Sequence, residues 1–566
     1  MQGARLEKKD YILTSSAIIF YLISLIIAKF SLHYYLSFYF YLGALATVLF
    51  AAIRSVNLAH LKSILRQNLF FLLLLLIISL PFHLAFLRTY PLVSVGDELR
   101  DGGINAVAVA EGKIQNIFSY VRYEASSFFI PWVISHLYPL IGRSVLLFRL
   151  PAALMASLNL VLFFLLLRSL RVSALIAFLT TLLLFSLPWH LFYARTELIN
   201  LLNVSAALIL FCLLRNYLQN RSLKNLILLA TAAGFFFNFH ATVKFLGFNI
   251  LLLLLLDQAL HWVRRFYYQR SLNLSSFFFF VFYLVFFAFL GFGPLLLFTP
   301  LRTFFTLHRF YQGGGGTLWQ RILSHKTQLL ENYYHSFNFF RGQEAARGWY
   351  PRHEVFLPPE LMILLAVGFL VSLREKDKYY CFLVLTFFLT LTTNSALTDV
   401  YNADYRILPL MIIALIFVAR GGHWLRQLLP SPFIWHVLTV VVLIFSLLRV
   451  GNFFLNEEAN KERRVGSFLL THTIYWLQKQ NLASGTINLI LSPENKELFQ
   501  LLHYQEQWQY FLPQLQVNSQ SDPNLGENEV KVRLNGQNQG RQIILCQPRE
   551  RFLCPPQSSL PLIINY

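Results

Sequence analysis

Two adjacent carboxylates, Asp97 and Glu98, stand where a long apolar segment gives way to polar sequence. They belong to "LVSVGDELRDGG" (92–103), which follows "NLFFLLLLLIISLPFHLAFL" (68–87) almost directly. A carboxylate at the edge of a low-dielectric region can have its proton affinity tuned and act as a general base. The neighbouring Glu98 could orient an acceptor, raise the pKa of Asp97, or bind a divalent cation together with Asp97. The structural alternative is that Ser94 and Asp97, which have the spacing of a capping box, start a short helix.

Three single cations each stand at one end of an apolar segment. They are Arg195 in "SLPWHLFYARTELIN", Lys244 in "FHATVKF" and Arg406 in "LTDVYNADYRILP". One such cation can be explained by a side chain that reaches the lipid phosphates. Three of them on the face that carries the carboxylates predict a bound anion. A lipid phosphate is the natural candidate, because arginine can donate two parallel hydrogen bonds to it.

The long polar segment 301–358 adds aromatic side chains, including Trp349, Tyr350 and Tyr333. They could stack on a sugar ring or lie in the aromatic belt at the membrane surface, which is the commoner role. The glycine run 313–316 lacks the Gly-Lys-Ser/Thr that completes a phosphate-binding loop, so it predicts a hinge or a slack segment. A loop of this length is typical of a lid or a binding loop.

These residues need a scaffold, and the composition predicts a multi-pass membrane protein. Of the 566 residues 56% are hydrophobic and only 13% are charged, with a mean hydropathy of +0.53. Soluble domains carry about 25% charged residues. Apolar runs flanked by charge predict about thirteen transmembrane helices. They fall near 12–30, 33–53, 69–88, 145–167, 173–193, 197–214, 223–240, 243–261, 276–298, 359–374, 379–397, 404–420 and 433–450.

Lysine and arginine orient these helices. With a cytoplasmic N-terminus, every short cytoplasmic connection carries two or three basic residues, whereas the short outer connections hold only Lys29, Arg195, Lys244 and Arg406. By the positive-inside rule, loops 89–144 and 301–358 and the tail from 452 then lie outside the cytoplasm. We therefore expect a protein of the cytoplasmic membrane, with Asp97 and Glu98 on its outer side.

The distribution of the net charge of +20 and the spacing of the four cysteines argue against a nucleic-acid-binding protein and a cysteine zinc site. The charge is spread over helix ends that would face anionic lipid, so it does not indicate nucleic-acid binding. The cysteines have no CxxC or zinc spacing. Cys546 and Cys554 fall in the outer tail, where a disulfide and two free thiols are both consistent with the compartment. No cofactor is required, and a divalent metal near the carboxylates is the one open alternative.

The tail, 452–566, predicts a small α/β appendage to the all-α membrane domain, 1–451. "NEEANKERRVGSFLLTHTIYWLQKQN" and "PENKELFQLLHYQ" have helical periodicity, and "TINLILS" is a strand candidate. The polar segment "NSQSDPNLGENEVKVRLNGQNQGRQ" is rich in turn residues and predicts loops or a hairpin.

The order of motifs resembles a known family. The outer "DE", "LLFRLPAALMASLNLVLFFLL", "LPWHLFYARTELIN" and "FHATVKF", then "LLENYYHSFNFFRG" and "LTDVYNADYRILPLMIIA", are similar to bacterial GT-C type glycosyltransferases. The closest likeness is to family 39, the group of the protein mannosyltransferases and aminoarabinose transferases. The resemblance covers roughly 90–420, and each motif is degenerate while their order is specific.

The resemblance implies a membrane enzyme that moves a sugar from a polyprenyl-phosphate donor to an extracytoplasmic acceptor, usually with inversion. The family's acidic residue in the first outer loop matches Asp97. The sequence departs from the family in having two additional spans before this loop and no lysine beside Pro131, so Arg122 becomes the candidate for that phosphate contact. A transporter or flippase of lipid-linked sugars is the alternative. It would place ionisable residues near mid-span, often in related halves.

Overall fold

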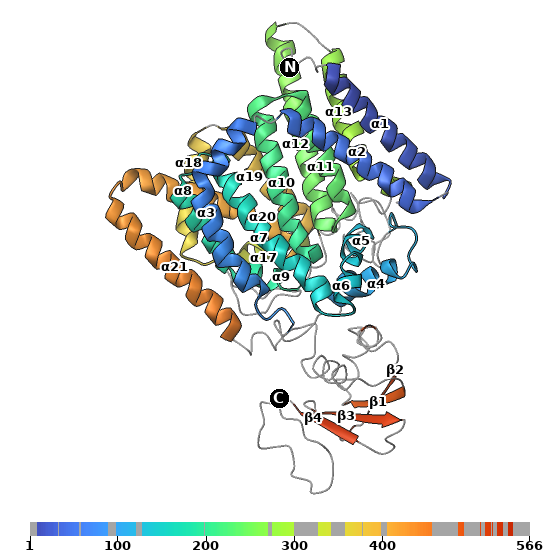
Figure 1. Cartoon of the computed structure of the whole chain (residues 1–566). Helices are drawn as coiled ribbons and strands as arrows, with labels where there is room; N and C mark the ends of the chain where they lie inside the picture. The colour runs from blue at the N-terminus through green and yellow to red at the C-terminus, as the bar shows by residue number, and fades with distance from the viewer. Residues whose placement is uncertain are drawn as a thin grey trace.

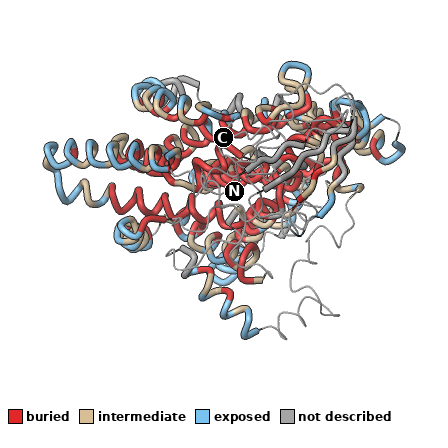
Figure 2. Tube along the Cα trace, turned by 90° about the horizontal axis from the view of Figure 1, so that it is seen from below, coloured by how far each residue is buried: buried red, intermediate tan, exposed pale blue. Residues whose placement is uncertain are grey.

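In the computed structural model the described residues are 8–31, 33–55, 58–88, 98–119, 127–196, 198–269, 274–298, 326–340, 357–375, 377–397, 404–455, 485–491, 510, 515–521, 523, 529–535 and 542–546. The helices form one large bundle, and four strands lie beyond one end of it (Figure 1). Buried residues run through the middle of the bundle, and exposed ones lie along its outer helices (Figure 2). The predicted helical membrane domain with an appendage that contains strands is therefore confirmed.

Ten helices of the described part are long and apolar enough to cross a membrane. They are α1 (Lys8–Lys29), α2 (Tyr34–Ser55), α3 (Leu58–Leu84), α7 (Leu146–Ser169), α10 (Leu198–Asn220), α12 (Ala241–Gln269), α13 (Leu274–Phe292), α19 (Lys378–Leu391) together with the π-helix η5 (Thr392–Ala396) that continues it, α20 (Asp404–Leu428) and α21 (Pro432–Leu455). Three shorter apolar helices are α8 (Ala174–Ser186), α11 (Leu223–Phe235) and α18 (Leu361–Arg374). Every predicted span coincides with one of these helices, and whether the three shorter ones cross the membrane stays a prediction.

The predicted span 173–193 is not one continuous helix. It breaks after Ser186, because Leu187 is extended (φ −67°, ψ 126°) and Pro188 starts the short helix α9 (Pro188–Tyr193). A proline disfavours helical backbone at the residue before it and is well tolerated at a first helical position. The consequence is a change of direction just before Arg195.

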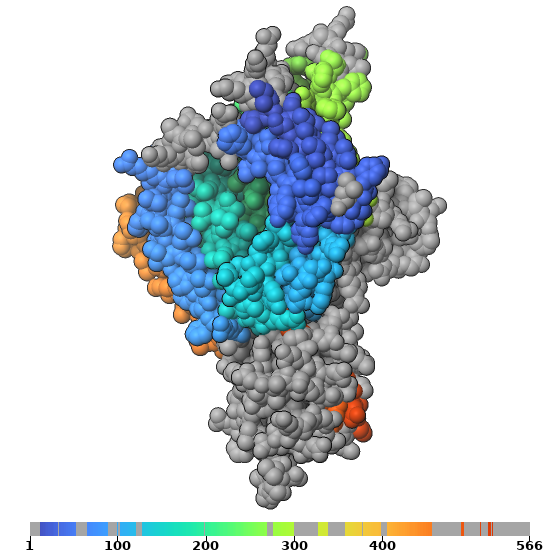
Figure 3. Space-filling model, turned by 45° about the vertical axis from the view of Figure 1, so that its right-hand side comes forward, coloured from blue at the N-terminus to red at the C-terminus, as the bar shows by residue number. Residues whose placement is uncertain are grey.

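The first two helices form a hairpin that lies apart from α3. The helices α1 and α2 pack on each other, α2 packs on α11, and the hydroxyl of Tyr21 donates to the carbonyl of Phe289 at 3.0 Å. The helix α3 packs instead on α7 and α8. Figure 3 shows a hollow between α3 and the α1–α2 hairpin, with later helices in teal and green behind it.

Helices α18 and α20 approach so closely that their backbones touch. A Cβ added at Gly368 would collide with the carbonyl of Phe417, and one at Gly421 would collide with the carbonyl of Leu364. Small residues at such positions let apolar helices pack without intervening side chains. This contact sets the distance between α18 and α20, two of the helices that surround the site described below.

Short elements join the long helices at the end of the bundle near the strands. They are the π-helices η1 (Glu98–Ile104) and η5 (Thr392–Ala396), the 3₁₀ turn η3 (Phe236–Asn238) and the helices α4 (Asn105–Ala110), α5 (Phe129–Ser135), α6 (Tyr138–Ile141), α14 (Leu295–Phe298) and α17 (Lys326–Phe340). We call this the loop end, since the segments 89–144 and 301–358 leave the bundle here. The other end is called the opposite end.

The four strands form a mixed sheet in the order β2-β1-β3-β4. They are β1 (Gly485–Leu491), β2 (Leu515–Ser521), β3 (Glu529–Asn535) and β4 (Gln542–Cys546). The strand β1 pairs parallel with β2 and antiparallel with β3, and β3 pairs antiparallel with β4. The predicted strand in "TINLILS" is confirmed as β1. Loops or a hairpin were predicted for 518–542, and the structure has β3 within this segment, paired with β4 just beyond it. The prediction of loops from 518 onward is wrong for β2, because a polar edge strand lacks the apolar alternation used to recognise strands. The predicted tail helices lie outside the described residues.

Candidate active site at the loop end

The loop end buries polar side chains between α10, α12, α17, α19 and α20. Their central member is Asn394 in η5, which is 3% exposed. Its Nδ2 donates to the carbonyl of Thr242 at 3.2 Å and to the carbonyl of Arg406 at 3.3 Å. One amide therefore ties the first turn of α12 to the first turn of α20. Among the described residues its Oδ1 has no hydrogen-bond partner, so it can accept a bond from a ligand.

The same two helix starts carry two of the predicted phosphate ligands. Lys244 is 4% exposed and Arg406 is 7% exposed. The ring of Tyr405 lies 5.6 Å from the Arg406 guanidinium carbon and 5.2 Å from the ring of His240. Two buried cations are costly unless anions or polar groups surround them. Cations from distant parts of the chain thus meet in one buried polar region.

Helix α10 joins this region from the other side, since Asn203 donates from Nδ2 to the carbonyl of Tyr405 at 3.4 Å. Helix α17 closes it. The hydroxyls of Tyr333 and Thr392 are hydrogen-bonded, Ser336 and Ser395 share a hydroxyl contact of 2.6 Å, and Asn332 donates to the carbonyl of Ala396 at 3.0 Å. We call this set the polar cluster; it comprises Asn203, His240, Thr242, Lys244, Asn332, Tyr333, Ser336, Thr392, Asn394, Ser395, Tyr405 and Arg406.

An entirely apolar cavity of about 230 Å³ lies beside the polar cluster. It is lined from four helices, by Phe337 of α17, Met362 of α18, Phe387 of α19 and Ala414 of α20 among others, and every lining side chain is hydrophobic. Phe337 comes one turn after Tyr333 on α17, a rise of about 6 Å. One helix therefore presents a hydroxyl to the polar cluster and a ring to the cavity.

The third predicted phosphate ligand, Arg195, has protein partners. It is fully buried, and its guanidinium donates to the carbonyls of Phe82 (2.7 Å), His83 (3.1 Å) and Ala85. The guanidinium carbon also lies 4.8 Å from the ring centre of Phe454. The last carbonyls of a helix lack intrahelical partners, so Arg195 caps the end of α3. This gives it a positioning role, and its phosphate contact stays a prediction.

A second buried arginine, which was not predicted from the sequence, binds the backbone just after the end of α3. Arg149 on α7 is 0% exposed and donates to the carbonyl of Leu87 at 3.2 Å. The two arginines together hold the residues 82–87, after which the segment 89–144 begins. A cation inside the motif "LLFRLPAALMA" was the available signal, because charged residues inside spans are usually functional.

The carboxylate pair itself is only partly described. The π-helix η1 begins at Glu98, so Asp97 is the residue directly before it; Asp97 and the side chain of Glu98 lie outside the described residues. Both the general base and the capping alternative remain predictions. The helix is fixed in place, since a Cβ at Gly102 would stand 2.7 Å from the Cβ of Phe148 on α7.

Salt bridges further hold the segment 89–144. Glu111, just after α4, accepts from Arg143 at 2.5 Å and from Lys113 at 2.6 Å. These bonds, that of Lys113 foremost, lower the pKa of Glu111. The C-terminal region reaches the same place, because Tyr510 is buried and donates to the carbonyl of Ser144 at 3.4 Å. The segment between β1 and β2 therefore contacts the segment 89–144 at Tyr510.

The other predicted site residues, Arg122, Trp349 and Tyr350, lie outside the described residues, as does Cys554. Within the described part no group of three or more His, Cys, Asp or Glu side chains could hold a metal ion. That part omits Asp97, so a metal beside the carboxylates stays an untested alternative. The residues of the polar cluster other than Lys244, Arg406 and Tyr333 were not predicted. For Thr392, Asn394 and Ser395 the available signal is the polar run "TTNSA" at the end of an apolar segment.

Comparison with known proteins adds a distant likeness. No protein-family model matches the chain, and no curated protein matches it. Two crystal structures of ArnT from Cupriavidus metallidurans are similar. The one bound to undecaprenyl phosphate is 15% identical with a TM-score of 0.43, and the apo state is 16% identical with a TM-score of 0.45. Each match covers 80% of this chain and 86% of the other. Likeness at this level assigns no role to any residue of this chain.

Proposed function

We propose that the chain is a membrane glycosyltransferase of the GT-C type that takes a sugar from a polyprenyl-phosphate donor and transfers it to an acceptor outside the cytoplasm. The observation that carries this proposal is the polar cluster, with its two buried cations, standing one helical turn from an apolar cavity. A ligand that fills both must be anionic at one point and hydrocarbon next to it. A polyprenyl phosphate has this build, and undecaprenyl phosphate, which one ArnT structure binds, belongs to that chemical class.

The donor phosphate is assigned to Lys244 and Arg406. A phosphate that leaves with the bonding electron pair needs charge neutralisation more than protonation, and fixed cations in a buried site provide it. The first isoprene units of the donor are assigned to the cavity between α17, α18, α19 and α20, whose apolar lining accepts hydrocarbon without burying an unpaired polar group. Tyr333, with Trp349 and Tyr350, is assigned to the sugar and the acceptor.

Asp97 is the proposed general base. The hydroxyl oxygen of the acceptor attacks the anomeric carbon, the bond from that carbon to the phosphate oxygen breaks, and the proton of the hydroxyl passes to the Asp97 carboxylate. A single displacement of this kind inverts the anomeric carbon. Glu98 orients the acceptor or supports Asp97, and Arg149 and Arg195 act as positioning residues, because they hold the chain from which the carboxylates project.

Ligand binding by the purified full chain tests the donor assignment. Undecaprenyl phosphate should raise the melting temperature in detergent, whereas inorganic phosphate and undecaprenol, each of which offers half of the chemistry, should raise it much less. Arg406→Gln should remove the preference for the phosphorylated lipid. Equal stabilisation by undecaprenol and undecaprenyl phosphate would show that no phosphate site exists there.

A further inference from the structure

The opposite end of the bundle contains a second site that the proposed reaction does not use. It is an open cavity of about 600 Å³ where α7, α10, α12 and α19 come together. Its charged lining consists of Arg171, Arg215, Arg221, Lys378 and Asp377, with His261 beside them. Arg215 lies near the end of α10 and Lys378 begins α19, while Arg171 and Arg221 lie in the connections after α7 and α10, so four cations face one space.

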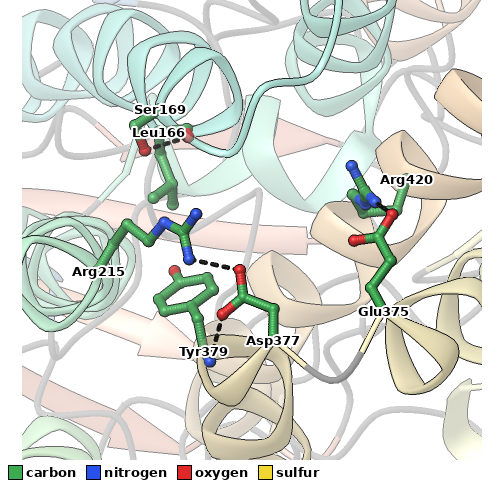
Figure 4. A network of polar contacts seen from close by, with 7 residues as sticks. All are labelled: Leu166, Ser169, Arg215, Glu375, Asp377, Tyr379 and Arg420. Carbon is green, nitrogen blue, oxygen red and sulfur yellow. Dashed lines mark hydrogen bonds and ion pairs between the residues drawn. The ribbon is translucent and has the colours of Figure 1, made fainter. Parts of the chain in front are cut away.

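Ion pairs account for only part of this charge. Arg215 donates to Asp377 at 2.7 Å (Figure 4), while Arg221 at 2.8 Å and Lys378 at 3.2 Å share the single carboxylate of Asp257. The pair of Arg420 and Glu375, also drawn in Figure 4, satisfies its own charges. Two carboxylates thus pair with three of the four cations, and the cavity keeps an excess of positive charge.

Arg171 is the cation that has no ion-pair partner among the described residues. It is exposed, follows Leu170, the C-cap residue of α7, and adopts a left-handed backbone with φ of 62°. Its amide donates to the carbonyl of Arg168 at 3.0 Å, and the next amide donates to the carbonyl of Leu167 at 3.1 Å. Glycine is the residue that normally closes a helix in this conformation, and a strained non-glycine residue is a reason to look for function.

We propose that this cavity binds a phosphate group, the head group of an anionic phospholipid or a soluble phosphate ester. Arginine side chains can grip a phosphate through two parallel hydrogen bonds. The cavity lies at the ends of apolar helices, and Leu218 forms part of its wall, which suits a lipid held at head-group level. Basic pockets between transmembrane helices bind anionic head groups for the same reason.

The test compares Arg171→Gly with Arg374→Gln in the full chain. Arg171→Gly removes a charge from the cavity and should fold at least as well, because glycine fits the left-handed backbone. Arg374→Gln removes one exposed charge at the same end but outside the cavity. In one arm, native mass spectrometry follows titration with phosphatidylglycerol and with phosphatidylcholine. In the other, thermal melting follows addition of inorganic phosphate.

We expect Arg171→Gly to weaken phosphatidylglycerol binding about tenfold or more, while Arg374→Gln and the phosphatidylcholine titration show little change. Stabilisation by inorganic phosphate that Arg171→Gly abolishes would support the same site with a soluble ligand. If Arg171→Gly fails to fold, Arg221→Gln decides by the same readouts. Equal behaviour of the cavity variant and Arg374→Gln in both arms would overturn the proposal.

Discussion

The buried cations of the loop end are chemically alike but have different surroundings. The guanidinium of Arg195 donates hydrogen bonds to the carbonyls of Phe82, His83 and Ala85. Lys244 and Arg406 instead lie in the first turns of two helices that Asn394 joins. The sequence could single out all three, since each breaks the positive-inside pattern. The sequence could not show which of the three cations caps a helix and which can bind a ligand, because these roles depend on which distant backbone carbonyls lie within hydrogen-bonding distance.

This difference leads to a prediction. Arg195→Gln should lower the melting temperature, because buried carbonyls lose charged donors worth about 1.5–3 kcal/mol each. Lys244→Gln should instead raise the KM for the donor about 10–100-fold with a smaller change in stability. Lys29→Gln, an exposed cation at the same end, is the control for charge alone. Thermal melting and donor kinetics separate the two effects. Donor kinetics that match the wild type in Lys244→Gln would leave Lys244 with a structural role inside the polar cluster.

Asp97 carries the second prediction at this scale. Asp97→Asn keeps the size of the side chain but loses the proton acceptor, so turnover should fall about 10²–10⁴-fold while donor binding persists. Glu98→Gln should have a smaller effect, or a comparable one if the two share a metal. Asparagine is also a good helix cap, so the capping alternative predicts normal turnover in Asp97→Asn. The assay is glycosyl transfer by purified protein whose folding is checked by thermal melting.

Among the elements, α17 links polar and apolar chemistry. Its sequence "KTQLLENYYHSFNFF" shows tyrosine and phenylalanine four residues apart, but not which helices they would meet. The contacts of Tyr333 with η5 and of Phe337 with the cavity come from tertiary packing. The break at Pro188 could be predicted from its residue type, whereas the π-helical turns η1 and η5 have no comparable local signal.

The cavity gives a prediction for these elements. Ala414→Phe should fill part of the space between α18, α19 and α20 and weaken the use of donors with long polyprenyl chains. Donors with a short, water-soluble chain should be used as before, because the polar cluster is unchanged. Leu370→Phe, on an exposed position of α18, is the matched control. An equal loss for short and long donors in Ala414→Phe would contradict the assignment of the cavity to the lipid chain.

At the scale of the whole molecule, the two ends of the bundle carry different electrostatics. The opposite end has clustered cations around an open cavity, and the loop end has buried cations among polar side chains and backbone carbonyls. The composition and the periodicity were sufficient to predict the helical bundle, because burial in lipid requires long apolar helices. The way these helices pack, and hence the hollow beside the α1–α2 hairpin (Figure 3), depends on contacts between distant segments and could not be predicted.

Orientation in the membrane is the corresponding prediction. Single cysteines introduced at Gly314 and Asn535 should react with an impermeant thiol reagent in intact cells or spheroplasts, whereas one at Ser222, which caps α11 at the opposite end, should react only after permeabilisation. The background is the chain with its own four cysteines replaced by serine. Labelling of Ser222 alone would invert the topology and remove the access of the loop end to an outer acceptor.

The most direct test of the central claim is the location of the sugar donor in membranes of a strain that lacks the protein. Mass spectrometry should find one accumulated polyprenyl-phosphate sugar and the loss of one extracytoplasmic glycan, both reversed by the wild-type chain and not by Asp97→Asn. The accumulated donor should lie in the outer leaflet, where periodate added to intact spheroplasts destroys it. Accumulation in the inner leaflet, protected from periodate, would contradict a transferase and identify a transporter of the lipid-linked sugar.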